Sequence, residues 1–599
     1  MGISTSRARR LSAAFALTGV AALTLAACTT TSGGGGGDEG GDEQTITVAV
    51  DNAVTSLNSG TPQSNLNTNG MVDYLTGNGQ GPGTAFTLDQ EFNIVPDETN
   101  LTYELLSDDP LSVQYTIADG ATWSDGEAMT VDDLVLSWAI GSGHYDDATL
   151  DPETGEVTGG TQYFTLAGST TGLDTTSFPE YDREAGTLTL TYDEPYVDWE
   201  LVNLIGKPAH VLADKAGVTA QELTEILEAA PAGDPAAPAE PIAELQAVAD
   251  VWNTGYDITS MPSDESLLVA AGAFVVTDYT ANDGGSIVLE PNPEWAGEEV
   301  AYDRLILSFI NDSNAQVAAL RNGEVDIIAP QASADTLAAL EDANAVIDQG
   351  DQLSYDHLDL SFDSPVFSNP TYREAFLLTV PRQQILDSIV TPINPEAEVL
   401  DSQLFVSSQP QYEDATAVNG YDRYTEPDIA AAQELLAGAT PEITILYNSE
   451  NPNRVDSFQL IQASAQEAGF IVNDGGSPDW SSLLGAGGYD ASIFGWVSPG
   501  AGYAGLPQIW QTGGGGNYNA YSNPEVDALV DQTQTIIDDA EAIDELQIQI
   551  DTLTAEDFYG LPLFQAPGLD AHTGRVDGVS YFGGQTGVVW NANSWTIAE

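Results

Sequence analysis

The residue types that most often carry out catalysis or bind metals are scarce in this chain and poorly spaced. Its four histidines are His144, His210, His357 and His572, and no two of them form the His-Glu-x-x-His pattern of a zinc site. The single cysteine, Cys28, has no second cysteine with which to build a thiolate site. The chain has no Gly-x-Ser-x-Gly turn to present a serine nucleophile. The sequence therefore predicts no catalytic residue, no metal site and no cofactor.

Paired carboxylates and phosphate-binding loops are the other sequence signals for catalysis. Asp132-Asp133 and Asp538-Asp539 are pairs of the kind that supply a general acid and base, yet such dyads need a converging geometry that sequence does not give. Chance pairs are abundant among 92 acidic residues. Gly206-Lys207 lacks the preceding glycine of a P-loop and is followed by proline. A secreted hydrolase remains an alternative without an identified catalytic centre.

The N-terminal residues predict export and attachment to a membrane. Three arginines precede a largely apolar run, residues 11–26, and small residues lie just before Cys28, which is the pattern of a signal peptide. The run is shorter than the ~20 residues of a membrane-spanning helix. Leu25-Ala-Ala-Cys28 resembles the bacterial lipobox, whose cysteine carries a diacylglyceryl group. We expect a signal peptide over residues 1–27 and a flexible tether over residues 28–44.

The net charge limits the possible partners of this protein. The chain carries 92 Asp and Glu against 13 Lys and Arg, which gives −79 at pH 7. This charge excludes nucleic acid and opposes docking on anionic lipid headgroups. It favours neutral or cationic ligands, because the field over the surface attracts positive charge. Simple solubility in a salty or calcium-rich exterior is the alternative explanation for most of the charge.

Strand and helix patterns both occur in the remainder of the chain. Leu188, Leu190 and Tyr192 alternate as in a strand, whereas residues 131–138 have helical spacing behind a capping box of Thr130 and Asp133. This mixture is typical of an α/β or α+β protein.

Three later segments have clear boundaries in the sequence. A strand at residues 443–447, a helix with apolar positions at residues 458–468 and a strand at residues 470–472 predict a βαβ unit with parallel strands. Asn523-Pro524 predicts the start of a long acidic helical region that ends before Gly560. Residues 229–241, rich in Ala and Pro, predict a surface insertion or linker.

A long string in the first quarter of the chain resembles that of a known family. Tyr115-Thr-Ile-Ala-Asp-Gly-Ala-Thr-Trp-Ser-Asp-Gly126 is followed by Thr130-Val-Asp-Asp-Leu-Val-Leu-Ser-Trp138. This succession of strand, Trp-Ser-Asp-Gly turn and Thr-x-x-Asp helix is similar to that of the extracellular solute-binding proteins of family 5, which serve peptide, nickel and related ABC importers.

Further pieces follow in the order that this family shows: Pro208-Ala-His210, Ala271-Gly-Ala-Phe274, Asn292-Pro-Glu-Trp295, Asn322-Gly-Glu-Val-Asp326 and the stretch 517–527. Most of these residues suit a structural role. Asp125-Gly126 suits a turn, Gly323 suits a helix C-cap, and Trp123 and Trp138 suit a core.

The resemblance also implies where a ligand binds. In peptide-binding members, a Gly-Trp pair is followed, three residues after the tryptophan, by an aspartate that takes the α-ammonium group of the ligand. Here Gly495-Trp496 is followed by Pro499, which cannot supply that charge-assisted hydrogen bond. Either Asp490 or another acid substitutes, or the ligand has no free α-amine.

The candidate ligand-binding residues are Trp496, Ser498, Asp490, Tyr503, Asn67, Tyr74, Tyr521 and Arg373. Trp496, Tyr503 and Trp510 offer flat surfaces for a sugar, an aromatic group or a cation, with core packing as the equal alternative. For Arg373, the alternatives are a ligand carboxylate and a surface ion pair.

The fold that the resemblance implies is a two-lobed α/β fold of the periplasmic-binding-protein type II, with an extra subdomain in the first lobe. Residues 45–70, 263–334 and 556–599 are assigned to lobe I, residues 71–262 to its subdomain, which contains the Ala/Pro-rich insertion, and residues 335–555 to lobe II. A ligand enclosed between hinged lobes favours the closed state.

The implied function is that of the substrate-binding component of an ABC importer, acting as a monomer. It would capture a short peptide and deliver it to a permease and ATPase complex, while the lipid on Cys28 holds it at the outer face of the bacterial cytoplasmic membrane. The alternatives are a non-peptide solute (an oligosaccharide or a metal chelate), a secreted hydrolase, and an adhesion or signalling module.

Overall fold

A computed structural model describes residues 44–79, 81–150, 157–167, 172–282, 284–497, 501–537 and 539–598. The signal peptide, Cys28 and all but the last residue of the tether, as predicted, lie outside the described residues, as do Ser498 and Pro499. Residues 44–599 form one compact unit. Within the described part of the chain, no helix combines the length and the apolar character needed to cross a membrane.

A mixed sheet of ten strands runs through this unit in the order β10-β11-β12-β1-β13-β18-β14-β17-β15-β16. The strands are β1 Thr45–Val50, β10 Phe274–Thr280, β11 Ser286–Pro291, β12 Arg304–Phe309, β13 Ile327–Ile328, β14 Val346–Leu360, β15 Glu442–Asn448, β16 Ile471–Ser477, β17 Ala491–Val497 and β18 Gly560–His572.

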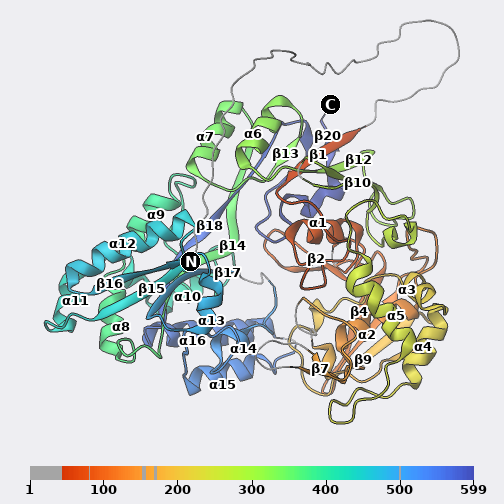
Figure 1. The fold of residues 1–599 in the computed structure, drawn as a ribbon, viewed down its shortest axis with the longest axis horizontal. Coiled ribbons are helices and arrows are strands. Elements are labelled where there is room, and N and C mark those ends of the chain that lie inside the picture. The colour runs from red at the N-terminus through yellow and green to blue at the C-terminus, as the bar shows by residue number, and fades with distance from the viewer. Residues whose placement is uncertain are drawn as a thin grey trace, which may run out of the picture. The chain divides into compact units, whose positions relative to one another are not determined.

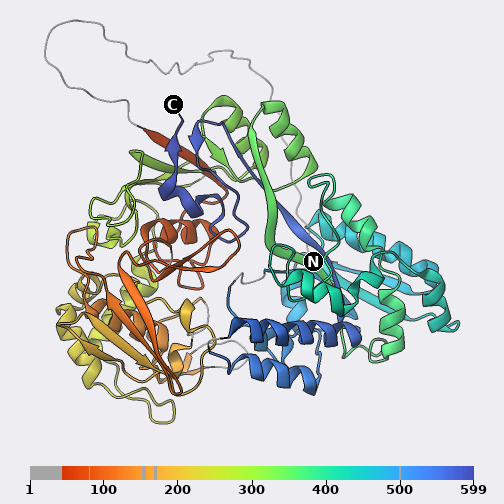
Figure 2. The same ribbon diagram turned by 180° about the vertical axis from the view of Figure 1, so that it is seen from behind.

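Two long antiparallel strands, β14 and β18, connect the two halves of this sheet (Figures 1 and 2). One end of β18 pairs with β13, and the other part of β14 pairs with β17. The pairing of β14 with β18 changes register between Asp351 and Tyr355. Such an irregularity interrupts the ladder and bends the strand locally. The two halves therefore meet where the pairing of β14 with β18 is irregular.

The first half of the sheet is built around β1, which is parallel to β12 and β13. Its side chains alternate in burial from Thr45 to Val48, and Ile46 and Val48 are fully buried. Helices α6 Ser313–Asn322 and α7 Ala334–Ala343 pack together beside β13, and α1 Asn67–Thr76 packs against β10. The C-terminal residues return here: the Tyr302 hydroxyl donates to Ala592 O, and Trp595 is fully buried.

Residues 86–268 add a four-stranded antiparallel sheet in the order β4-β5-β9-β8, with helices against it. Its core is continuous with that of the first half of the main sheet, since Val48 and Trp138 belong to the same cluster of buried side chains. The division between lobe I and its subdomain therefore stays a prediction. The elements are β2 Phe86–Leu88, β3 Ile94–Pro96, β4 Leu101–Asp108, β5 Leu111–Ile117, β6 Thr149–Leu150, β7 Val157–Gly159, β8 Glu180–Asp182, β9 Thr187–Thr191, α2 Val131–Ser142, α3 Ala209–Ala216, α4 Ala220–Ala229 and α5 Ala243–Asp250.

The second half of the sheet has its own core, which contains Ile443, Ile445 and Ile493. Parallel strands β15, β16 and β17 pack against α12, and α8 packs on α11. The helices of this half are α8 Pro370–Leu377, α9 Arg382–Ile389, α10 Tyr412–Asn419, α11 Ile429–Leu436, α12 Pro452–Ala468, α13 Trp480–Ala486, α14 Leu506–Trp510, α15 Pro524–Thr533 and α16 Ala540–Glu556.

Local sequence signals predict several of these elements correctly. The capping box of Thr130 and Asp133 opens α2. The βαβ unit is confirmed, with β15 and β16 parallel and Gly469 in the left-handed conformation at the end of α12. The long acidic helical region expected after Asn523 is confirmed, since Asn523 caps α15 and the region ends before Gly560. It consists of two helices, and Asp539 caps the second by accepting a hydrogen bond from Ala542 N.

Candidate functional site

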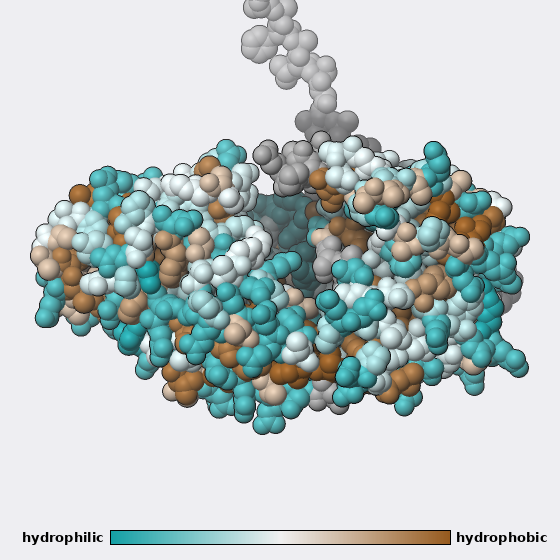
Figure 3. Space-filling view, turned by 90° about the horizontal axis from the view of Figure 1, so that it is seen from below, coloured by the Kyte–Doolittle hydropathy of each residue, from teal (hydrophilic) through white to brown (hydrophobic). Residues whose placement is uncertain are grey.

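A cavity of about 320 Å³ lies where the two halves of the sheet join. Its lining comes from the end of β1 and the two residues after it, the first turns of α1, the residues after β13, the middle of β14 and β18, the end of β17, and residues 581–588. A space-filling view shows a face that is largely hydrophilic and hollowed near its middle (Figure 3). A ligand in this cavity would touch segments of both halves.

Two buried polar groups that line the cavity lack a hydrogen-bond partner. Thr68, in the first turn of α1, has 3% of its surface exposed, and Asp570, in β18, has 4%. Thr68 Oγ1 and Asp570 Oδ2 make no hydrogen bond within the described part of the protein. An unpaired buried hydroxyl or carboxyl costs free energy, so such groups are usually satisfied by a ligand or by water. The second acid in the lining, Asp51, accepts a hydrogen bond of 2.7 Å from Gln316.

Burial raises the pKa of Asp570 to about 8, and the neighbouring Asp348 adds to the rise. Asp348 lies directly opposite Asp570 in the pairing of β14 with β18. His572 Nε2 lies 3.6 Å from Asp348 Oδ2, so the nearby imidazole of the described chain is directed at Asp348 and not at Asp570. Asp570 is therefore an acid whose charged form lacks compensation in the unliganded protein.

Tyr581 forms one wall of the cavity and lies over a pair of glycines. Gly350 and Gly568 face each other across β14 and β18. A Cβ atom added to either glycine would collide with the Tyr581 ring. Glycine is therefore required at both positions for the tyrosine to pack directly on the backbone of the two connecting strands.

Gly568→Val is expected to displace Tyr581, to cost about 1–3 kcal/mol of stability and to weaken ligand binding, because the added side chain occupies the volume of the tyrosine ring. Urea denaturation and ligand titration of the purified protein measure the two effects. Gly120→Val is the matched control, since a Cβ atom at Gly120 has no neighbour within 4 Å, although its positive φ of 84° adds some strain. Equal stability of Gly568→Val and the wild type would contradict this role of the glycine pair.

The structure places one residue of the predicted ligand set, Asn67, and the neighbour of another, Val497, in the lining of the cavity. Asn67 lines it from the first turn of α1, and Val497 lines it from the end of β17. Trp496 precedes Val497, is half-buried, and stacks between His357 and Tyr518, with ring centroids 6.2 and 6.0 Å away. Ser498, the next residue along, lies outside the described residues.

The other predicted residues line neither described pocket, and each has a partner within the protein. The Tyr74 hydroxyl donates to Trp590 O. Asp490 accepts hydrogen bonds from the Ser364 hydroxyl and Thr444 N. Tyr503 N donates to Asp198, and the Tyr503 hydroxyl lies 3.4 Å from Asp544.

Tyr521 and Arg373 are both buried against structural partners. Tyr521 is 1% exposed and donates to Asp557 Oδ2. Arg373 is 7% exposed, donates to the carbonyl oxygens of Asp557 and Phe367, and lies over the Phe362 ring. Neither the carboxylate of a ligand nor a surface ion pair accounts for this guanidinium. Trp510, 4% exposed, packs in the same cluster as Tyr521.

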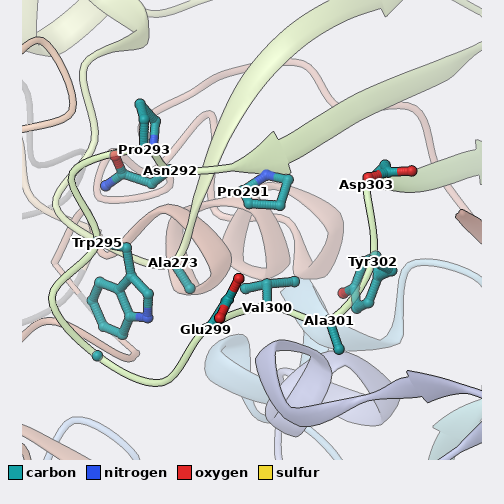
Figure 4. Close-up of a pocket in the computed structure, with 11 residues that line it drawn as sticks. Ala273, Pro291, Asn292, Pro293, Trp295, Glu299, Val300, Ala301, Tyr302 and Asp303 are labelled. Atoms are coloured by element: carbon teal, nitrogen blue, oxygen red, sulfur yellow. The ribbon is translucent and has the colours of Figure 1, made fainter. Parts of the chain in front are cut away.

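A larger pocket of about 520 Å³ lies elsewhere, along the loop that connects β11 to β12 (Figure 4). Trp295 lies at one side of it and Tyr302 at the other, with Glu299 and Val300 between them. Trp295 Nε1 donates to Glu298 O, which holds the loop against the ring. None of the predicted ligand-binding residues lines this pocket, and it does not touch β14 or β18.

Sequence reasoning missed Asp570, Thr68 and Tyr581. One signal for Asp570 was available, since it stands among Leu569, Ala571 and the apolar residues of a long strand. An isolated acid in such a strand is either paired or functional. Within the described ranges, no group of three or more His, Cys, Asp and Glu side chains is placed to hold a metal ion.

Several known proteins are similar to this chain in sequence or in fold. An uncharacterized lipoprotein of Mycobacterium leprae is 24% identical over 580 residues, which cover 92% of this chain and 94% of the relative. The oligopeptide-binding protein OppA of Mycobacterium tuberculosis is 24% identical over 504 residues, which cover 80% of this chain and 75% of OppA. The structure of the periplasmic EDTA-binding protein EppA superimposes with a TM-score of 0.75 at 21% identity, covering 93% of this chain and 97% of EppA.

The α/β fold that the sequence predicted is thus confirmed by its likeness to a solved binding protein. The family model described as "Bacterial extracellular solute-binding proteins, family 5 Middle" matches residues 100–518. Because that match spans more than half of its 599 residues, the chain belongs to the bacterial extracellular solute-binding proteins of family 5.

Proposed function

We propose that this solute-binding component of an ABC importer captures a short peptide in the cavity at the junction of the sheet and delivers it to a permease. The family consists of binding proteins and not of enzymes, so the hydrolase alternative is dropped. Support comes from one observation: the lining is contributed by both halves of the sheet, which are joined through β14 and β18. A ligand that contacts both halves stabilises the closed arrangement.

A peptide suits this cavity better than an anionic chelate does. One relative, OppA of Mycobacterium tuberculosis, is named an oligopeptide-binding protein, whereas EppA is titled an EDTA-binding protein. Among the described residues that line the cavity there is no Lys, Arg or His, and Asp51 and Asp570 are present. No cationic side chain of the described lining would compensate a polyanion such as EDTA there, and its charge would oppose the ionisation of both carboxyls. Asn67 and the segment around Trp496 are the predicted contacts that this location favours.

For the location of the protein, we propose a lipid on Cys28 that holds the chain at the outer face of the cytoplasmic membrane. Support comes from the Leu25-Ala-Ala-Cys28 sequence and from the Mycobacterium leprae relative, which is named a lipoprotein. A diacylglyceryl group provides two acyl chains, which is enough for stable attachment where one chain is not.

A thermal-shift screen of the purified protein tests the ligand class. Separate pools of short peptides, oligosaccharides and metal chelates are added, and the melting temperature is measured in each. A ligand at ~100 times its Kd adds about 2.7 kcal/mol to the free energy of unfolding, which is readily seen. We expect a shift with peptides. A shift with sugars or chelates alone would mean that the ligand belongs to that class and is not a peptide. An unchanged melting temperature in every pool would favour an adhesion or signalling module.

A further inference from the structure

We infer that the cavity binds a cationic group of the ligand, a primary ammonium, and that Asp570 is the residue that pairs with it. The identity of the ligand as a peptide rests on the proposed function, whereas the cation site rests on the cavity itself. In a peptide, the cation is either the α-ammonium group or a lysine side chain, and both present the same chemistry to a carboxylate.

The burial of Asp570 without a partner is the main observation. The residue has only 4% of its surface exposed, and its Oδ2 atom is buried and makes no hydrogen bond inside the described protein. Buried Asp551, by comparison, accepts hydrogen bonds from Ser402, Gln403 and Asn419. Asp570 lines the cavity, whereas Asp551 lines neither described pocket. The structure therefore leaves room for a donor that the protein does not provide.

The groups around Asp570 add negative charge. Asp348 faces it from β14, and Asp351 is the last paired residue before the change of register in the same strand pair. Asp51, directly after β1, lines the same cavity. His572, on β18, is directed at Asp348 instead, and Tyr581 covers the strands from the C-terminal segment as a neutral phenol, since burial and Asp570 both raise its pKa.

No Lys, Arg or His side chain lies in the described lining, and the first turn of α1 adds some positive potential there. A helix N-terminus amounts to about half of one positive charge. Two carboxylates line the same cavity, so the field still favours a cation when they are ionised. Thr68 Oγ1, which is buried and unpartnered, is a neutral acceptor in the same turn. An ammonium group carries three donors and no acceptor, so it can satisfy both the carboxyl and the hydroxyl.

Binding of a cation at Asp570 is linked to the loss of its proton. In the unliganded protein, burial and Asp348 raise the pKa of Asp570 to about 8, so the carboxyl is mostly protonated near pH 7. An ammonium group favours the ionised carboxylate, and the proton leaves to solvent as the ion pair forms. The affinity for a lysine side chain should therefore rise between pH 6 and pH 9.

The test measures the affinity of the full chain for paired peptides by calorimetry. One pair carries lysine or norleucine in the middle of a tripeptide with both ends blocked, and a second pair has a free or an acetylated N-terminus. We expect one cationic member to bind at least about tenfold more tightly than its neutral match. Asp570→Asn should remove that preference and its rise with pH. Thr68→Val should reduce the preference, while Asp119→Asn, at an exposed turn, should leave it unchanged.

The outcomes separate the cation site from the peptide proposal. Equal affinity for cationic and neutral peptides, or a preference that persists in Asp570→Asn, would overturn the cation site and leave peptide capture standing. If no peptide binds, cadaverine decides the question, because it offers the ammonium group without a peptide. Binding of cadaverine to the wild type and not to Asp570→Asn would support the site, and absence of binding to both would overturn it.

Discussion

Arg382→Ala is expected to destabilise the protein by about 3–5 kcal/mol, because it removes a fully buried guanidinium that donates hydrogen bonds to several buried oxygen atoms. This side chain lies at the start of α9. It donates hydrogen bonds to the carbonyl oxygens of Tyr421, Tyr424, Leu400 and Pro562 and to Asp401 Oδ1, at 2.6–3.1 Å. Alanine would leave four carbonyls and one carboxylate without a donor, in a site that water enters poorly.

The position of these acceptors explains why the effect should be large. Pro562 belongs to β18, one of the two strands that connect the halves of the sheet, whereas Tyr421 and Tyr424 belong to the core of the second half. Arg382 therefore ties α9 to the connecting strand. Urea denaturation gives the free energy of unfolding. Arg321→Ala, in the exposed last turn of α6, is the control and should change stability by less than about 0.5 kcal/mol. A loss below about 1 kcal/mol for Arg382→Ala would contradict this role.

The elements that the sequence predicted correctly are those whose signals are local. Thr130 and Asp133 form the capping box of α2, and Gly469 ends α12, within a few residues of the helix that each delimits. The helical region expected after Asn523 is confirmed, but its division into α15 and α16 was not predicted. Asp539 is one acid among many there, and its capping bond to Ala542 N depends on the chain turning after Thr533.

The connecting strands were not predictable from local patterns. β14 contains Asp348, Asp351 and Asp356 and shows no clear apolar alternation. Its extended conformation is imposed by pairing with β18, more than 200 positions later in the chain, and the register of that pairing is a tertiary property. The cavity was not predictable for the same reason, because its walls come from segments that are far apart in the sequence. Thr68 and Asp570 line the same cavity only once the chain is folded.

The candidate site shows how family resemblance and physical reasoning differ. The resemblance to the family predicted a ligand contact at Gly495-Trp496. These residues belong to β17, whose last residue, Val497, lines the cavity. It also raised the question of which acid takes the place of the one replaced by Pro499. Asp490, the acid named for this purpose, has both oxygens engaged by Ser364 and Thr444. Burial without a partner identifies Asp570 instead, a criterion that requires coordinates.

Asp570→Asn is expected to make the unliganded protein more stable than the wild type at pH 8, and to make the two nearly equal at pH 4. The folded-state pKa of Asp570 is raised to about 8 by burial and by Asp348, against about 4 in an unfolded chain. A raised pKa means that the folded state holds the proton more tightly, so this contribution to stability is complete below pH 4 and is lost as the pH rises toward 8. For one such group, the slope approaches about 1.4 kcal/mol per pH unit.

Asparagine cannot ionise, so the variant should lack this slope while it keeps the size of the side chain. The measurement is the difference in free energy of unfolding between the variant and the wild type, taken by urea denaturation at several pH values, so that the other carboxyls cancel. The same subtraction with exposed Asp119→Asn should give a line close to zero. A destabilised Asp570→Asn protein at pH 8 would mean that the carboxylate supports the fold. A gain in stability would mean that the protein keeps a costly acid in the wall of its cavity, which is expected of a residue retained for its ligand.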